Sequence, residues 1–140
     1  MSDAELLPEF AGFVESARRN VLAFPHCRSC GRFHWYPMPR CPHCRGAEIE
    51  WKQVSGHGRL FSFTVVRHAF DKSRRDRLPY VVGLVTFEDA PGVRFITNVV
   101  GTDGSDLRID QPLEPVFEDD EGGRRLLLFR AAGSVERRTP

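Results

Sequence analysis

The sequence has no long apolar run and no excess of charge of one sign, the two features that would indicate a membrane protein or a nucleic-acid-binding protein. No apolar run approaches the roughly 18 residues that a membrane span needs, so we expect no membrane-spanning segment. Charge of one sign is not in excess, because 20 lysines and arginines stand against 19 aspartates and glutamates. A formal charge of +1 argues against a broad nucleic-acid surface, which normally carries a marked basic excess, although it is compatible with a local basic patch.

Catalytic signatures are also missing. The sequence contains no G-x-S-x-G nucleophile elbow, no G-x-x-x-x-G-K phosphate loop and no H-E-x-x-H motif. His57 and His68 can act as bases, but the sequence links no nucleophile to either of them. We therefore predict that the chain is not an enzyme on its own.

Cysteine is scarce, and its placement is informative. All four cysteines lie in two C-x2-C turns, Cys27 with Cys30 and Cys41 with Cys44. Two facing turns of this kind supply four thiolates, which suits one structural zinc ion in a tetrahedral site. Iron in a rubredoxin-like site would use the same four sulfurs. Two disulfides or a single redox pair are weaker alternatives.

The surroundings of the turns carry further expectations. No signal-like apolar segment stands at the start of the chain, so we expect a cytoplasmic protein whose thiols stay reduced. Gly31 and Gly46 follow the two turns, where positive φ is expected. Three histidines lie near the turns and are expected to face solvent or to donate hydrogen bonds around the sulfurs. Four arginines also lie near the turns and are expected either to offset the charge of a zinc tetrathiolate or to lie in solvent. These residues are His26, His34, His43, Arg28, Arg32, Arg40 and Arg45.

The chain before the cysteines predicts an amphipathic helix over 8–19. Ser2-x-x-Glu5 resembles a capping box at its start. Such a helix can cover the core of its own domain or present its apolar face to a partner. The face consists of residues at i, i+3, i+4 and i+7, namely Phe10, Phe13, Val14 and Ala17.

After the cysteines the hydrophobic period changes to two. Strands are predicted at 59–66, 80–87, 93–100, 113–117 and 124–129, with breaks rich in glycine and aspartate between them. In the first strand Phe61, Phe63 and Val65 are expected to face inward. Five short strands without a long intervening helix favour an OB-fold barrel, with an SH3-like barrel or a small sandwich as alternatives. The expected division is an N-terminal helix (1–20), a rubredoxin-like zinc ribbon (21–54), a five-stranded OB-fold barrel (55–131) and a flexible tail (132–140).

Six short motifs stand along residues 8–130 in an informative order. They are Cys27-x-x-Cys30-Gly31, Pro37-x-Pro39-x-Cys41-Pro42-x-Cys44, Trp51 before Ser55-Gly56-x-Gly58, Pro79-Tyr80-Val81-Val82, Thr97-Asn98-Val99-Val100-Gly101, and Val116-Phe117-Glu118-Asp119. In this combination the chain resembles the DUF35 family of acyl-CoA-associated zinc-ribbon/OB-fold proteins. The cysteine motif alone would be generic, and the two barrel motifs make the match more specific.

The resemblance implies a non-catalytic subunit that works beside a thiolase-like enzyme, of the lipid-transfer-protein type, or beside a MaoC-like hydratase. Such a subunit would bind or channel acyl-CoA in a hetero-oligomer, as an essential part of a thiolase, aldolase or hydratase complex. Retro-aldol cleavage of steroid side chains is one implied setting, with the chemistry placed in the partner. The acyl group and the partner's identity are not implied.

Contacts to acyl-CoA are expected from a basic loop between the first two strands, because guanidinium groups match phosphate oxygens. A solvated loop is the alternative. The candidate acyl-CoA contacts are Arg67, His68, Lys72, Arg74, Arg75 and Arg77.

Two further expectations concern the barrel. Asn98, among apolar strand residues, is expected to have a structural role. The second functional class is a module for single-stranded nucleic acid, with Phe61, Phe63, Phe95 and Arg94 as its stacking surface.

Overall fold

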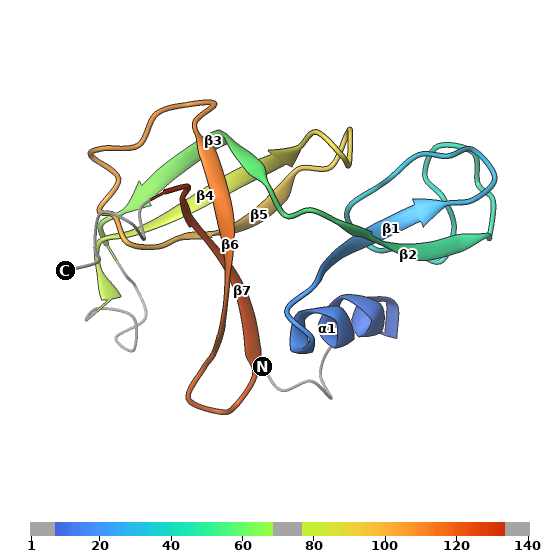
Figure 1. Ribbon diagram of the computed structural model, residues 1–140, viewed down its shortest axis with the longest axis horizontal. Coiled ribbons are helices and arrows are strands. Elements are labelled where there is room, and N and C mark those ends of the chain that lie inside the picture. The colour runs from blue at the N-terminus through green and yellow to red at the C-terminus, as the bar shows by residue number, and fades with distance from the viewer. Residues whose placement is uncertain (1–7, 69–76, 134–140) are drawn as a thin grey trace.

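The computed structural model describes residues 8–68 and 77–133, which form a small ribbon beside a barrel (Figure 1). A 3-10 turn, η2 (Pro8–Phe10), leads into α1 (Ala11–Arg18), and β1 (Leu22–Cys27) pairs with β2 (Ile49–Val54) in an antiparallel two-stranded sheet. The metal turns lie in the long connection between these two strands. The barrel strands are β3 (Gly58–Val66), β4 (Tyr80–Phe87), β5 (Phe95–Val99), β6 (Pro112–Asp119) and β7 (Arg125–Ala131).

The five barrel strands close in the order β3-β4-β5-β7-β6. All of their pairings are antiparallel except the parallel contact of β5 with β7. This is the OB-fold topology, so the prediction of a mainly β chain with a helix, a ribbon and a five-stranded OB-fold barrel is confirmed. The third strand is shorter than the predicted 93–100, because Val93 closes the preceding turn through its N–H to the carbonyl of Ala90. The exact division of the chain into domains stays a prediction.

The first barrel strand departs from simple alternation. Its register with β4 shifts between Leu60 and Ser62, so that Leu60 lies opposite Val85 and Ser62 opposite Leu84. This β-bulge adds one residue on β3, and Phe61 is that residue. Leu60 is fully buried in the barrel, whereas Phe61 is 46% exposed. The prediction that Phe61 faces inward is therefore wrong, while Phe63 and Val65 do pack against the core.

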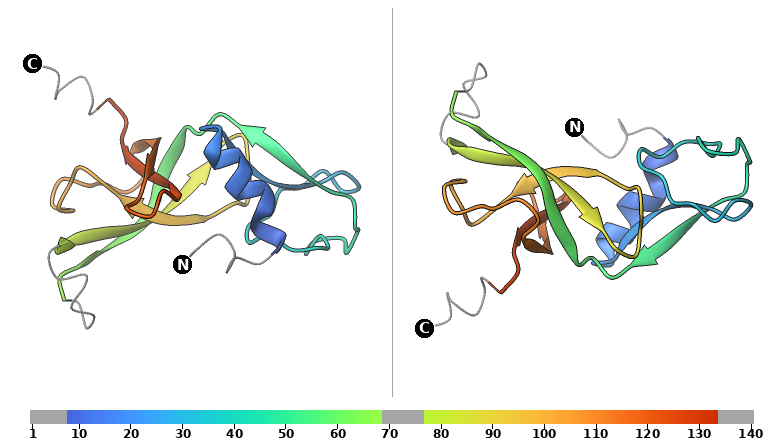
Figure 2. Two further views of the ribbon diagram at one scale, coloured as in Figure 1. Left: turned by 90° about the horizontal axis from the view of Figure 1, so that it is seen from below. Right: turned by 90° about the horizontal axis from the view of Figure 1, so that it is seen from above.

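Helix α1 lies across the junction of ribbon and barrel (Figure 2). Its Gly12 approaches the Trp51 indole so closely that a Cβ at this position would lie 2.3 Å from Nε1. The Phe13 ring contacts Trp35 of the ribbon and Phe95 of the barrel. The helix therefore covers the core of its own chain, the first of its two expected uses. Its predicted capping box, Ser2 and Glu5, lies outside the described residues.

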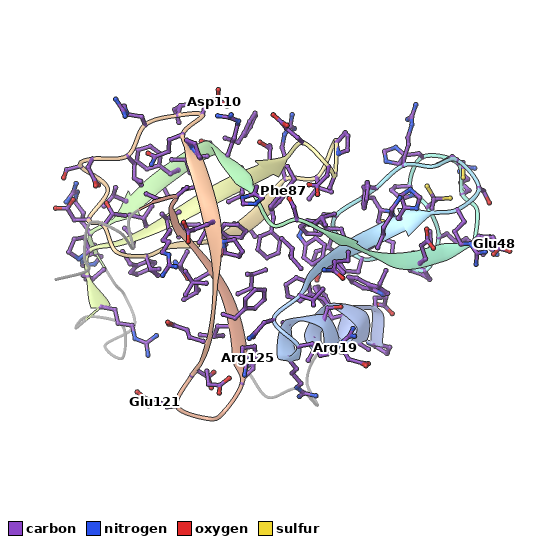
Figure 3. All side chains as sticks on the ribbon, in the orientation of Figure 1. Arg19, Glu48, Phe87, Asp110, Glu121 and Arg125 are labelled. Atoms are coloured by element: carbon purple, nitrogen blue, oxygen red, sulfur yellow. The ribbon has the colours of Figure 1, made fainter. Side chains whose placement is uncertain are left out.

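The end of α1 is tied to the barrel by Arg125 of β7 (Figure 3). The Arg125 guanidinium donates to the carbonyls of Ala17 and Arg18, both at 3.5 Å, and to the side-chain oxygen of Asn20. A cation at these carbonyls is favourable because the last turn of a helix carries partial negative charge.

None of the described helices is long and apolar enough to cross a membrane.

Ribbon and barrel share one core, centred on Phe24 of β1. The Phe24 ring is fully buried and lies 5.1 Å from Phe87, 5.5 Å from Trp35 and 5.8 Å from Phe95, measured between centroids. Figure 3 shows Phe87 where the barrel faces the ribbon. The Trp35 indole, although it belongs to the ribbon, packs on the barrel and the helix, because a module this small has almost no core of its own.

The pairing of β6 with β7 contains a partly buried ion pair, and the contribution of this pair to the stability of the fold depends on pH. Glu114 accepts hydrogen bonds from the Gly133 N–H at 3.0 Å and from Arg130 at 3.0 Å, and these two partners hold the pKa of its carboxyl below the ordinary 4.5. A carboxyl with a depressed pKa stabilises the fold above its unfolded pKa and ceases to do so as pH falls through the folded value.

We expect Glu114→Gln to lower the free energy of unfolding at pH 7 by less than about 1 kcal/mol, because the pair is partly solvated. The difference from the unsubstituted protein should shrink once pH falls below about 4.5 and vanish below the folded pKa of Glu114. Urea unfolding at several pH values measures this difference. A difference that is constant from pH 7 to pH 3 would contradict an electrostatic origin.

Candidate metal centre and its surroundings

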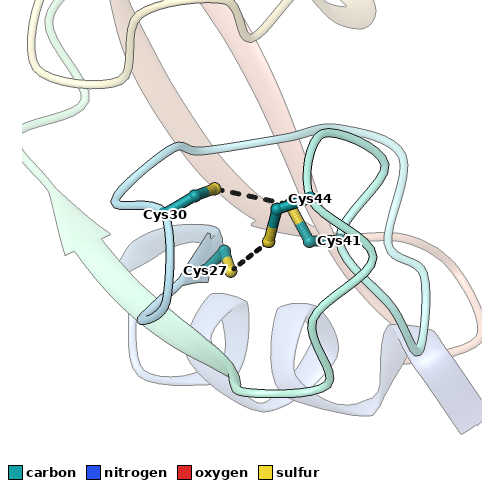
Figure 4. A group of neighbouring side chains, drawn as sticks. All are labelled: Cys27, Cys30, Cys41 and Cys44. Atoms are coloured by element: carbon teal, nitrogen blue, oxygen red, sulfur yellow. Dashed lines mark hydrogen bonds between the residues drawn. The ribbon is translucent and has the colours of Figure 1, made fainter.

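The four cysteines converge at the far end of the ribbon (Figure 4). Cys27 ends β1, Cys30 follows in the first turn, and Cys41 and Cys44 come from the second turn. The sulfurs of Cys27 and Cys44 are 3.6 Å apart, those of Cys30 and Cys41 are 3.7 Å apart, and all four lie within 4.8 Å of one another. A tetrahedron with Zn–S bonds of about 2.3 Å has edges of about 3.8 Å, so the sulfurs fit a zinc ion.

The same distances exclude the disulfide alternative for this structure. A disulfide needs an S–S distance of about 2.05 Å, and all four cysteines are free thiols. In residues 8–68 and 77–133 they are also the one group of His, Cys, Asp or Glu that could hold a metal. Zinc therefore remains our assignment from the donor set, with iron as the alternative that uses the same sulfurs.

Both turns are built on the same backbone pattern. The Gly31 N–H donates to the Cys27 carbonyl and the Arg45 N–H to the Cys41 carbonyl, each at 2.8 Å. Gly31 has φ +77° as expected, but in the second turn the positive φ falls on Arg45, at +68°. The expectation for Gly46 is therefore wrong, because Arg45 stands four residues after Cys41 as Gly31 does after Cys27. A Cβ at Gly46 would make tight contacts, at 3.3 Å from the Cys44 sulfur and 3.3 Å from the Ser29 hydroxyl oxygen.

Backbone N–H groups donate hydrogen bonds to the sulfurs and so favour the ionised thiolate form that binds a cation. The Cys41 sulfur accepts from the His43 N–H at 3.3 Å, and the Cys44 sulfur from the Gly46 N–H at 3.4 Å. At Cys27, a hydrogen bond from the backbone of Cys30 is the largest effect that lowers the thiol pKa, to about 7. At Cys30 the N–H of Arg32 acts in the same direction, but lost hydration and the neighbouring sulfurs raise the pKa to about 11. Four thiols this close do not all ionise together at neutral pH, whereas a dication would ionise them all.

The three nearby histidines have different surroundings. His26 Nδ1 lies 2.8 Å from a Glu50 carboxylate oxygen, and His43 Nε2 lies 3.3 Å from the Phe33 carbonyl. Neither of these ring contacts is to a sulfur. His43 is exposed, as expected, whereas the partly buried His26 ring pairs with a carboxylate instead. His34 does not meet the expectation, because it is 4% exposed and neither ring nitrogen has a hydrogen-bond partner among the described residues. Burial lowers the pKa of His34, so its neutral form is favoured. The arginines near the turns are exposed, as expected: Arg28, Arg32, Arg40 and Arg45.

Only some of the candidate acyl-CoA contacts lie in the part of the chain that the structure describes. Arg67 and His68 follow β3 and are exposed, while Lys72, Arg74 and Arg75 lie outside the described residues. Arg77 lines a groove of about 330 Å³ on the outside of the barrel. The groove lies beside the seam where β5 and β7 meet at a single residue pair, Val99 with Phe129. Its other lining side chains include Tyr80, Asn98, Glu118, Leu126 and Leu128.

Sequence reasoning missed the apolar wall of this groove. Leu126 and Leu128 point outward, whereas Leu127 and Phe129 fill the barrel. The uninterrupted apolar run 126–129 was the available signal, because a strand with one wet face would alternate. The expected structural role of Asn98 is confirmed in part, since its Nδ2 donates to the Val81 carbonyl at 3.1 Å, and the residue also lines the groove.

Comparison with known proteins agrees with this architecture. The family model of the ChsH2 rubredoxin-like zinc ribbon domain matches residues 14–50, and that of the ChsH2 C-terminal OB-fold domain matches residues 51–118. The benzoylsuccinyl-CoA thiolase subunit BbsA of Thauera aromatica is 25% identical over 126 residues, which are 88% of this chain and 83% of that protein.

Two solved structures are also similar. A chain of the Ltp2-ChsH2(DUF35) aldolase is 26% identical with a TM-score of 0.80, over 91% of this chain and 98% of that one. A DUF35-family protein of unknown function from Sulfolobus solfataricus has a TM-score of 0.62 at 17% identity, over 89% of this chain and 85% of that one, and it shows the shared fold alone. The two ChsH2 domain models together match residues 14–118, and ChsH2 is a DUF35 protein, so the chain belongs to the DUF35 family, with the zinc-ribbon and OB-fold domains of its ChsH2 members.

Proposed function

We propose that this protein is an accessory subunit that assembles with a thiolase-like enzyme and binds or channels its acyl-CoA substrate. The observation that carries the proposal is the likeness to the Ltp2-ChsH2(DUF35) aldolase, which extends over nearly the whole of both chains. The relation to a benzoylsuccinyl-CoA thiolase subunit points to the same kind of partner. The partner's reaction would then be thiolysis or retro-aldol cleavage of an acyl-CoA.

The proposal assigns a structural zinc ion to the four cysteines and no catalytic role to the chain itself. A zinc ion held by four thiolates has no open position for a water or a substrate, so it stabilises the ribbon and does not activate a nucleophile. The free thiols suit the reducing cytoplasm, where we place the protein. Catalytic groups would come from the partner.

Assembly is tested by co-expressing the chain with thiolase-like enzymes from its own genome. We expect one of them to co-elute with the chain in gel filtration and to gain thiolase or aldolase activity, while the chain alone has neither activity. Separate peaks for every such enzyme, with no gain of activity on mixing, would count against the proposal. A MaoC-like hydratase that co-elutes in their place would correct the partner class.

The groove at the β5–β7 seam is our candidate for acyl-CoA contact. Arg77 at its rim offers a guanidinium for phosphate oxygens, and Tyr80, Leu126 and Leu128 offer apolar walls for the pantetheine or acyl portion. Arg67 and His68 follow the neighbouring strand and would extend the cationic rim. Lys72, Arg74 and Arg75 belong to the same proposal.

We expect Arg77→Ala to weaken coenzyme A binding about tenfold or more, because it removes a charge-assisted contact to phosphate. Isothermal titration of the complex with coenzyme A measures the change. Arg19→Ala is the matched control, since Arg19 is an exposed arginine next to the end of α1. Equal affinities of the Arg77→Ala variant and the unsubstituted complex would remove Arg77 from the site.

The alternative function, binding of single-stranded nucleic acid, finds less support. Of its three candidate rings, Phe63 and Phe95 pack in the core, and Phe61 alone is exposed. One exposed ring makes a poor stacking platform. A titration with single-stranded DNA at low salt is expected to show no strongly salt-dependent micromolar binding.

A further inference from the structure

The outer face of β3, β4 and β5 carries an apolar patch that the core does not use. We call it the outer patch and define it by Phe61, Leu84, Arg94 and Ile96. Phe61 is 46% exposed and Ile96 is 62% exposed, which makes them two of the most exposed large apolar side chains in the described residues. Leu84 between them is half-buried. Isolated exposed apolar residues are ordinary, but a contiguous group marks an interaction site.

Strand register shows that the group is contiguous. Leu84 of β4 lies opposite Ser62 of β3 and opposite Ile96 of β5, so the three positions form one row across the sheet. Directly opposite residues have Cβ atoms about 5 Å apart. The bulge at Phe61 places this ring beside Ser62 on the same row. A bulge re-aims a side chain at the cost of regular pairing, and here it turns an aromatic ring toward solvent.

Arg94 completes the outer patch. Its guanidinium carbon lies 4.5 Å from the centre of the Phe61 ring, so the cation covers one face of the aromatic side chain. Among the described residues, Arg94 forms no ion pair with a carboxylate. Aromatic residues and arginine are the types most often found at the energetic centre of protein interfaces.

Charge indicates what kind of surface would cover the patch. The strands β3, β4 and β5 contain no acidic residue, and Arg59 adds a second cation to their outer face. A second copy of this chain, docked about a two-fold axis on this face, would bring the same cations together without a carboxylate on these strands to neutralise them. The complementary surface is therefore that of a different protein, with an apolar side chain flanked by carboxylates.

We propose that the outer patch is the surface by which this subunit docks onto its thiolase-like partner. This inference rests on the proposed function and adds the face of contact. Two residues beyond Ile96 on the same strand, Asn98 lines the groove at the β5–β7 seam. A partner seated on the outer patch therefore lies beside that groove, where a substrate held by this subunit can be passed to it.

The test compares the unsubstituted chain with a Phe61→Thr/Ile96→Thr double variant and with Arg94→Glu. Threonine keeps the β-branched character that strands favour, and the replaced side chains are exposed, so both variants should fold. We expect the double variant to bind the co-eluting thiolase-like enzyme about 100-fold more weakly, and Arg94→Glu at least about tenfold more weakly, as for residues at an interface centre. Circular dichroism and metal content should be unchanged.

Ile109→Thr is the matched control, because Ile109 is 60% exposed and lies between β5 and β6, outside the patch. Its affinity for the enzyme should change by less than about twofold. In a second measurement, p-benzoylphenylalanine at position 96 should cross-link to the enzyme, and at position 109 it should not.

The outcomes separate this inference from the proposed function. If the unsubstituted chain binds the enzyme and the patch variants bind it equally well, the inference is wrong and the proposed function stands. If no thiolase-like enzyme binds, both fail. If the chain alone forms a dimer, or binds an oligothymidine, and the patch variants abolish this, the outer patch has another occupant and the inference is overturned.

Discussion

Removal of the metal is expected to unfold the ribbon and to lower the stability of the whole chain. Structural zinc sites contribute on the order of 10–16 kcal/mol in small peptides, which is comparable with the total stability of a domain. Without the ion, the two turns are held by the backbone hydrogen bonds of their own loops and by bonds to the rest of the ribbon, such as that from the Arg28 N–H to the Glu48 carbonyl. Replacement of Cys27 or Cys41 should act like a chelator, because both are buried and each supplies one of the four sulfurs.

The measurement is the metal content of purified Cys41→Ser protein together with its circular dichroism and thermal unfolding. Ser29→Ala is the control, because it changes the first metal turn, between Cys27 and Cys30, without removing a sulfur, and we expect it to keep one zinc ion per chain. Elemental analysis and visible absorption distinguish zinc from iron, since an iron site would be coloured. A Cys41→Ser protein with unchanged metal content and melting temperature would refute the assigned centre.

Phe24→Ala is expected to have the largest effect of any single core substitution away from the metal. The ring is fully buried and contacts Trp35, Phe87 and Phe95, so its loss leaves a cavity where ribbon, helix and barrel meet. Replacement of buried phenylalanine by alanine typically costs about 3–5 kcal/mol. Tryptophan fluorescence during denaturant unfolding should report the loss, because Trp35 is one of the chain's two tryptophans and lies against Phe24.

This substitution also tests whether ribbon and barrel are one cooperative unit. With a shared core, the Phe24→Ala protein should lose the stability of both parts, yet still bind zinc, because the sulfurs are positioned by the turns at the far end of the ribbon. Tyr36→Leu is the matched control, since its ring is 54% exposed and its loss should cost little. A stability change below about 1 kcal/mol for Phe24→Ala would mean that the two parts fold independently.

The sequence by itself was sufficient for the features that depend on residues close together in the chain. Cys27 and Cys30, like Cys41 and Cys44, meet across one turn, so their spacing already predicts a metal site. The barrel strands were predicted nearly in place because a period of two reflects the alternating faces of each strand. The helix followed from its 3.6-residue period in the same way.

Tertiary structure decided what depends on contacts between distant residues. The bulge that turns Phe61 outward exists only in the register of β3 against β4, and the groove beside Arg77 exists only where β5 meets β7. Trp35 packs on Phe95, 60 positions away in the chain, because the ribbon cannot bury an indole by itself. A local pattern records which face of an element is apolar, whereas the neighbour of that face is chosen by the packing of the whole chain.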